Sequence, residues 1–161
     1  MLTSEQLQTL KADIALVPEW TALPLTNSAA LLIADAYNAA ATPDFIVWRT
    51  NVSIDEIMRN GMAWDRVDNL TTGKARIWDW IGRLGTFDAS KPNIRAGIDA
   101  AWVGNAADLA VRATVYTHCK RKATKVEKLF ATGTGSGASP ATMAVEGRLS
   151  ADDVAQAREM A

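Results

Sequence analysis

The segment Asn105–Ala131, NAADLAVRATVYTHCKRKATKVEKLFA, has the longest helical spacing of apolar residues in the chain. These residues recur at intervals of three and four, which places them on one face of a helix. They are Leu109, Ala113, Tyr116, Cys119, Ala123, Val126 and Phe130. Gly133 follows, and glycine readily adopts the left-handed conformation that ends helices. We therefore predict one long helix over about residues 105–131, closed by Gly133.

The same segment carries an excess of positive charge. Its basic residues are Arg112, Lys120, Arg121, Lys122, Lys125 and Lys128. Against them stand only Asp108 and Glu127, so the segment has a net charge of +4 and the rest of the chain −5. A solvated helix face near its C-terminus explains this pattern. The alternatives are an acidic partner protein or DNA passing nearby, and the charge pattern also suits head-to-tail contact between copies in a ring.

Shorter helical patterns lie on both sides of this segment. Thr3 with Gln6, and Ser53 with Glu56, form capping-box patterns, and further helices are expected after Thr26, over 73–84, over 91–103 and after Ser150. Two β-branched or apolar stretches, 45–50 and 142–149, are typical of short strands, and their pairing with each other is a hypothesis. The predicted fold is mainly α: a single domain over 1–161, a compact bundle of about six helices with one or two short strands and a Gly-rich loop.

Composition bounds the class of protein. The 161 residues are 48% hydrophobic and 22% charged, which is typical of a soluble globular domain. No apolar run approaches the roughly 20 residues of a membrane span, and no signal peptide is expected. A lone cysteine excludes an internal disulfide. The net charge of −1 argues against a general nucleic-acid binder.

The six tryptophans are many for this length. They are Trp20, Trp48, Trp64, Trp78, Trp80 and Trp102. Most are expected in the core, and one or two are expected to anchor an interface, where tryptophan is enriched.

The glycine-rich stretch GTGSGAS, residues 133–139, resembles a phosphate-binding loop only superficially. A P-loop requires a lysine and a following helix, and neither the lysine nor the spacing of a dinucleotide fingerprint is present. Gly133, Gly135 and Gly137 alternate with small polar residues, and Pro140 follows. We predict a mobile loop over 132–141 that becomes ordered on a partner, and no nucleotide or other cofactor.

No residue pattern indicates catalysis or metal binding. His118 and Cys119 are the only histidine and cysteine, and adjacent helical residues point about 100° apart. Cys119 is expected in the core and His118 at the surface or its boundary. The acidic pairs Asp55–Glu56 and Asp152–Asp153 suit first helical turns. The chain is therefore expected to be no enzyme.

Several stretches resemble a family of uncharacterised proteins from tailed bacteriophages and prophages. They are LKADIA, IADAYN, FIVWRT and KRKATKVEKLFATGTGSGASPATMAVEGRLSADDVAQAR, and the likeness is weakest over about 62–104. The resemblance implies a virion component assembled in the host cytoplasm, and no catalytic residues.

Within that class, a head–tail connector or adaptor forming a ring fits the helical body, the charge polarity and the glycine loop. Its expected partners are copies of itself and other virion proteins such as portal or tail components, with DNA nearby but not specifically read. The contact residues are expected among the six basic residues of the long helix and Gly133, Gly135, Gly137 and Pro140. The alternatives are another tail-completion or decoration protein, or a small DNA-binding phage regulator.

Overall fold

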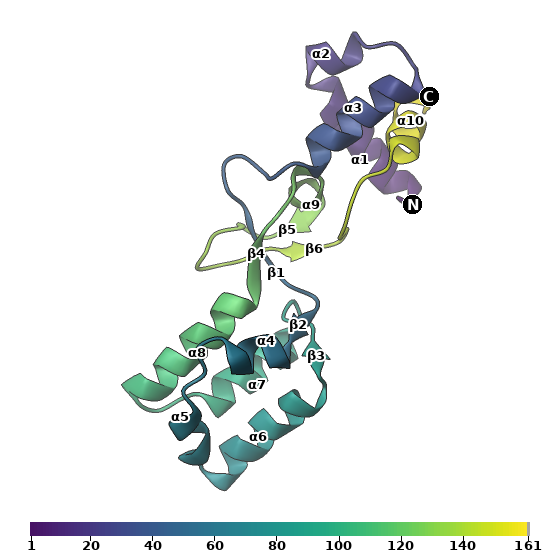
Figure 1. Ribbon diagram of the computed structural model, residues 1–161. Coiled ribbons are helices and arrows are strands. Elements are labelled where there is room, and N and C mark those ends of the chain that lie inside the picture. Colours follow the sequence, from purple (N-terminus) through teal and green to yellow (C-terminus); the bar gives the residue numbers. More distant parts are fainter. Residues whose placement is uncertain (161) are drawn as a thin grey trace. The chain divides into compact units, whose positions relative to one another are not determined.

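The structure, a computed structural model, describes residues 1–160 and is mainly α-helical (Figure 1). These residues form ten helices, and every strand is two or three residues long. The predicted fold class is confirmed, with more helices than the expected six. We predicted one domain over residues 1–161; the chain divides into two compact units, each with its own hydrophobic core.

The first unit comprises residues 1–46 and 122–161. Its elements are α1 (Ser4–Ala15), α2 (Pro18–Thr21), α3 (Asn27–Asn38), α9 (Lys125–Leu129), β5 (Ala131–Thr132), β6 (Thr142–Met143) and α10 (Ala151–Glu159). Helix α10 packs against α1 and α3. The core between these helices contains Leu10, Ile33, Tyr37 and Val154, none of them exposed to solvent.

The second unit comprises residues 47–121. Its elements are β2 (Val52–Ser53), α4 (Ile54–Arg59), α5 (Trp64–Asp68), α6 (Thr72–Arg83), β3 (Thr86–Phe87), α7 (Pro92–Ala101) and α8 (Ala106–His118). Strands β2 and β3 are antiparallel, with Val52 opposite Phe87. Helices α6 and α7 pack together, and Trp78 meets the fully buried Trp102 edge-on at 5.3 Å between ring centres.

The chain passes from one unit to the other within two strands. These are β1 (Ile46–Trp48) and β4 (Lys120–Lys122), which pair in a two-stranded sheet.

The predicted long helix over 105–131 is wrong. Helix α8 ends at His118, β4 follows, and α9 begins after Thr124 with a complete Thr124–Glu127 capping box. The backbone leaves the helix because it pairs elsewhere: the Arg49 N–H donates to the Cys119 carbonyl at 2.8 Å. Apolar residues therefore keep a helical spacing through a segment that is not one helix.

The predicted ends of other elements are confirmed in part. The capping box of Thr3 with Gln6 starts α1, and the Ser53 side chain caps α4. Gly133 ends no helix; it follows β5 with φ +121°. The hypothesis that 45–50 pairs with 142–149 is wrong, because β6 is antiparallel to β5, with Thr132 opposite Thr142. Helices α2 and α5 are too short to show a periodic pattern.

Candidate interaction surfaces

The six basic residues do not share one helix face. Arg112 lies on α8, with its Nη1 3.5 Å from the Asp99 Oδ1. The others are Lys120, Arg121 and Lys122 in β4, and Lys125 and Lys128 in α9. Residues up to Arg121 belong to the second unit and those from Lys122 to the first. Their charge is therefore divided between the units.

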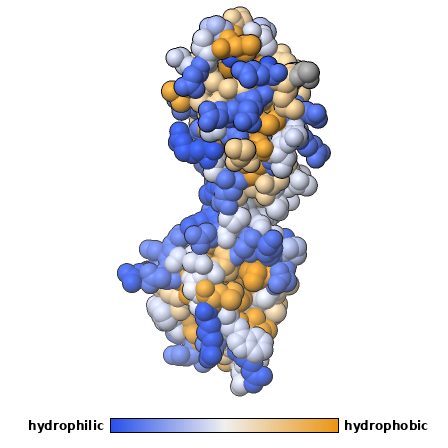
Figure 2. Space-filling view, turned by 90° about the vertical axis from the view of Figure 1, so that its right-hand side faces the viewer, coloured by the Kyte–Doolittle hydropathy of each residue, from blue (hydrophilic) through white to orange (hydrophobic). Residues whose placement is uncertain are grey.

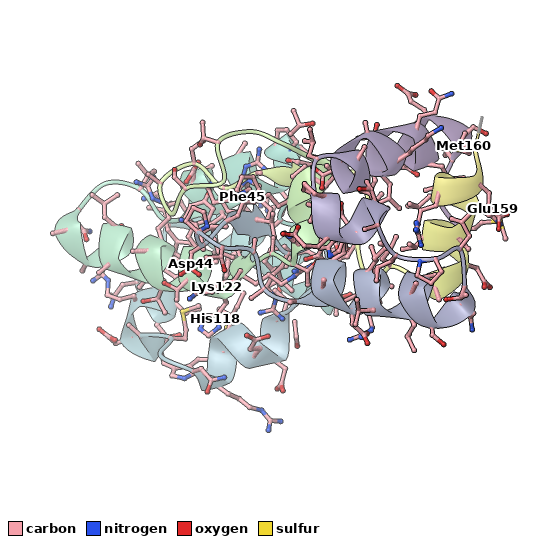
Figure 3. All side chains as sticks on the ribbon, turned by 90° about the horizontal axis from the view of Figure 1, so that it is seen from above. Asp44, Phe45, His118, Lys122, Glu159 and Met160 are labelled. Carbon is pink, nitrogen blue, oxygen red and sulfur yellow. The ribbon has the colours of Figure 1, made fainter. Side chains whose placement is uncertain are left out.

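In the first unit, each of the three lysines lies against a particular side chain. The Lys122 Nζ is 2.6 Å from the Asp44 Oδ2 (Figure 3). The Lys125 ammonium lies 4.7 Å from the centre of the Trp20 ring, and that of Lys128 lies 5.7 Å from the Phe45 ring. Such cation–π contacts contribute about 0.5–1 kcal/mol at exposed sites. They fix the lysine stems while the charges stay near the surface.

In the second unit, basic side chains surround an aromatic pair. Trp48 and Tyr116 lie 5.7 Å apart between ring centres. The Arg95 guanidinium is 4.8 Å from the Trp48 ring, and the Lys120 ammonium is 5.5 Å from it. The burial of Tyr116 raises the pKa of its hydroxyl, which donates to the Asp99 Oδ1 at 3.0 Å. These groups form a packed, positively charged surface.

The two units have opposite net charge. Residues 1–46 and 122–161 hold six basic and ten acidic residues, a net charge of −4. Residues 47–121 hold eleven basic and eight acidic residues, a net charge of +3. The charge asymmetry that the sequence assigned to one helix is thus a property of whole units.

The glycine-rich loop joins β5 to β6 and is anchored to its own unit. Gly135, Pro140 and Ala141 are buried. The Ile46 N–H donates to the Gly135 carbonyl at 2.7 Å, and the Ala141 N–H donates to the Ile46 carbonyl at 2.9 Å. Both ends of the loop are therefore held on one residue of β1.

The tip of the loop is closed by its own polar groups. The Thr134 hydroxyl donates to the Ser139 carbonyl at 3.0 Å, and the Ser139 N–H donates to the Ser136 Oγ at 2.9 Å. These bonds give the loop internal contacts of its own, and the mobility predicted for 132–141 stays a prediction. Gly137, in contrast to Gly135, lies exposed at the tip.

His118 and Cys119 occupy a structural network in the second unit. The Arg49 guanidinium donates to both Glu56 carboxylate oxygens, at 2.8 and 2.9 Å, and to the His118 carbonyl at 2.9 Å. The His118 Nδ1 lies 3.2 Å from the Glu56 Oε1. Cys119 is buried as predicted, and burial raises the pKa of its thiol to about 12. A protonated, enclosed thiol is a core group and not a nucleophile.

This network predicts an acid-sensitive stability. The hydrogen bonds from Arg49 lower the pKa of Glu56 from 4.5 to about 2. A depressed carboxylate pKa stabilises the fold above pH 4.5, and that contribution is lost as the pH falls toward 2. The urea concentration at the unfolding midpoint of wild type should therefore fall between pH 4.5 and 2. We expect it to fall less in Glu56→Gln, which lacks the carboxylate that titrates.

The matched control is Asp55→Asn. Asp55 is the preceding residue, and its carboxylate makes an exposed pair with Arg59 at 2.7 Å. Exposed pairs contribute about 0–1 kcal/mol, so this variant should keep most of the wild-type acid response. Equal acid responses in wild type and Glu56→Gln would contradict the assignment.

Sequence reasoning missed a group of exposed apolar side chains. In the first unit they are Leu16, Leu25, Leu31 and Leu32, and in the second Trp64, Trp80, Leu84, Val103 and Leu109. Figure 2 shows apolar residues lying open among charged ones. The sequence did contain a signal for the exposed leucines of α3. Its run SAALLIA places apolar residues on all sides of a helix, and such a helix is normally covered on more than one side.

Four hollows within the units have volumes of 210–320 Å³. Within residues 1–160, no three metal-ligating side chains are grouped to hold an ion, and no helix has the length and apolar character to cross a membrane.

No family model, curated protein or solved structure matches the chain.

Proposed function

We propose that the chain is a non-enzymatic structural protein of a bacteriophage virion, most specifically a head–tail connector or adaptor that self-associates into a ring. The observation that carries this proposal is the opposite net charge of the two units, and the large apolar side chains that both units expose support it. Exposed apolar patches on soluble chains mark interaction sites. The resemblance to phage and prophage proteins supplies the virion context.

A ring requires a particular kind of contact. Head-to-tail assembly joins two different surfaces of each copy, and it closes when the rotation between copies divides a full turn. A unit of net charge +3 and one of −4 in the same chain favour contact between unlike units of neighbouring copies. A symmetric dimer, by contrast, brings like surfaces together.

The proposed test is the state of the protein alone and in particles. Sedimentation velocity, native mass spectrometry and negative-stain microscopy should show a ring of several copies, and the protein should copurify with virions. A dimer that retards a DNA fragment would support a phage regulator instead. A monomer absent from particles would overturn the proposal.

The lysines of β4 and α9 are proposed to contact acidic surfaces of other virion proteins, such as portal or tail components, or nearby DNA. We expect the triple variant Lys120→Glu, Lys122→Glu, Lys125→Glu to enter particles at least about tenfold less, because charge reversal acts on every encounter. Melting temperature should change little, because surface ion pairs and exposed cation–π interactions contribute about 0–1 kcal/mol each.

The control is a charge reversal elsewhere. Asp55→Arg with Arg59→Asp exchanges an exposed ion pair of the second unit, whose side chains are 66% and 76% exposed, and keeps the net charge of that unit at +3. This variant should enter particles as wild type does. If the triple variant and the control enter particles equally, the lysines contact solvent and no partner.

A further inference from the structure

Two outward helix rows, one in each unit, have matching chemistry. On α6, Arg76, Trp80 and Leu84 follow one another at intervals of four, and Trp80 and Leu84 are 60% and 55% exposed. On α3, Leu31 lies four residues before Asp35, and it is 52% exposed. Residues four apart lie on one helix face. Each row therefore presents apolar side chains beside a charged one.

Each row lies on the side of its helix that faces away from the core of its own unit. Helix α6 covers its own core with Trp78 and Ile81, and α3 covers its own core with Ile33 and Ala34. The outward side chains have no such cover. Burying a Leu or larger apolar side chain is favourable by about 1.5–3 kcal/mol, so covering both rows supplies a driving force for association.

We propose that α6 of one copy packs antiparallel against α3 of the next copy. Each step of four residues advances about 6 Å along either helix, so the two rows stay in register. Trp80 then meets Leu31 and its neighbour Leu32, and Arg76 meets Asp35. This inference rests on the proposed self-association and names the surfaces that carry it.

The charges favour this pairing over the alternatives. Helix α6 belongs to the unit of net charge +3, and α3 to that of −4. Asp35 lies 3.6 Å from the Arg148 Nη2, but the two side chains are 63% and 77% exposed. Such a surface pair contributes about 0–1 kcal/mol and does not compete strongly with an enclosed contact. A central tryptophan with a charged rim is the common arrangement of an interface anchor.

Disulfide trapping tests the geometry directly. Leu31→Cys and Trp80→Cys are prepared separately, mixed and oxidised mildly; the native Cys119 is buried and does not interfere. A disulfide-linked dimer is expected from the mixture and from neither variant alone, because the contact joins unlike rows. The double variant should give a ladder of multimers. Leu109→Cys, exposed on α8, mixed with Leu31→Cys is the control and should give no dimer.

Charge exchange tests the energetics. Asp35→Arg or Arg76→Asp alone should weaken self-association about tenfold or more by sedimentation velocity, and the double exchange should restore most of it. Self-association of wild type that neither reversal weakens, with no trapped dimer, overturns the α3–α6 pairing and leaves the proposed ring standing. A wild-type monomer absent from virions overturns both.

Discussion

Replacing Trp102 with alanine is expected to lower the free energy of unfolding of residues 47–121 by about 3–5 kcal/mol. The Trp102 side chain is fully buried, and it is the largest of the fully buried side chains. Its removal leaves a cavity beside Trp78, which contacts it edge-on, and beside Ile98, one turn earlier on α7. Because a small domain has only about 5–15 kcal/mol of stability, this unit should be partly unfolded at 37 °C.

The measurement is urea denaturation followed by far-UV circular dichroism, with hydrogen exchange to locate the loss. Trp64→Ala is the matched control: its side chain is 59% exposed, and it should cost less than about 0.5 kcal/mol. Within residues 1–160 the Trp102 indole N–H has no hydrogen-bond partner, so Trp102→Phe also removes an unsatisfied donor and should cost less than alanine. Equal losses from Trp64→Ala and Trp102→Ala would contradict this account.

The tryptophans show what the sequence can predict and where it stops. Most were expected in the core, and Trp78 and Trp102 are buried, while Trp20 and Trp48 pack against the two cores in part. Trp64 and Trp80 are exposed. Only two of the six are therefore buried, so the expectation that most lie in the core is met only in part, and composition does not predict which ones are enclosed.

Helix starts were predictable where a local signal decides them. The capping boxes of Thr3 with Gln6 and Ser150 with Asp153 are fully formed. The box of Thr124 with Glu127 was overlooked, because the apolar spacing continues through it. A cap is a local interaction, and here it outweighs a periodic pattern of which only Cys119, Ala123 and Val126 are buried.

Pairing between distant segments was not predictable. Strands β1 and β4 have three residues each, too few for an alternating pattern, and β4 is the basic triplet Lys120–Lys122. A strand of this kind forms because a partner offers backbone groups, not because of its own side chains. The division into two units was not predicted either, and the opposite net charges of the units become visible only once their bounds are known.

The candidate surfaces were predictable only as a list of charges. The sequence identified the basic residues, but their division between a unit of net charge +3 and one of −4 depends on the fold. Likewise, a lysine that lies on an aromatic ring, as Lys125 does on Trp20, is brought there by segments distant in sequence. Exposure of Leu31 and Trp80 is similarly a property of the packed helices.

Replacing Gly135 with alanine is expected to destabilise the first unit by about 2–4 kcal/mol, from a left-handed backbone and an overpacked contact together. Gly135 has φ +65°, which side chains rarely adopt. A Cβ there would lie 2.1 Å from the Phe45 Cε2, so the ring or the loop must move. The Phe45 backbone is held by the hydrogen bond from the Ala123 N–H to its carbonyl at 2.8 Å, and a shift of the ring would disturb its contact with Lys128.

Gly137→Ala, two residues further on, separates this effect from loss of glycine as such. A Cβ at Gly137 meets nothing within 4 Å, and its φ is outside the left-handed region, so its stability should stay within about 0.5 kcal/mol of wild type. Hydrogen exchange should show faster exchange at the Ile46 and Ala141 amides in Gly135→Ala only, because these amides hold the loop to β1. If both variants are equally stable and Ile46 exchanges fast in wild type, the loop is a plain linker and its anchoring to Ile46 is wrong. Protection at Ile46 in wild type that is lost in Gly135→Ala would instead identify Gly135 as the residue that fixes the loop before any partner binds.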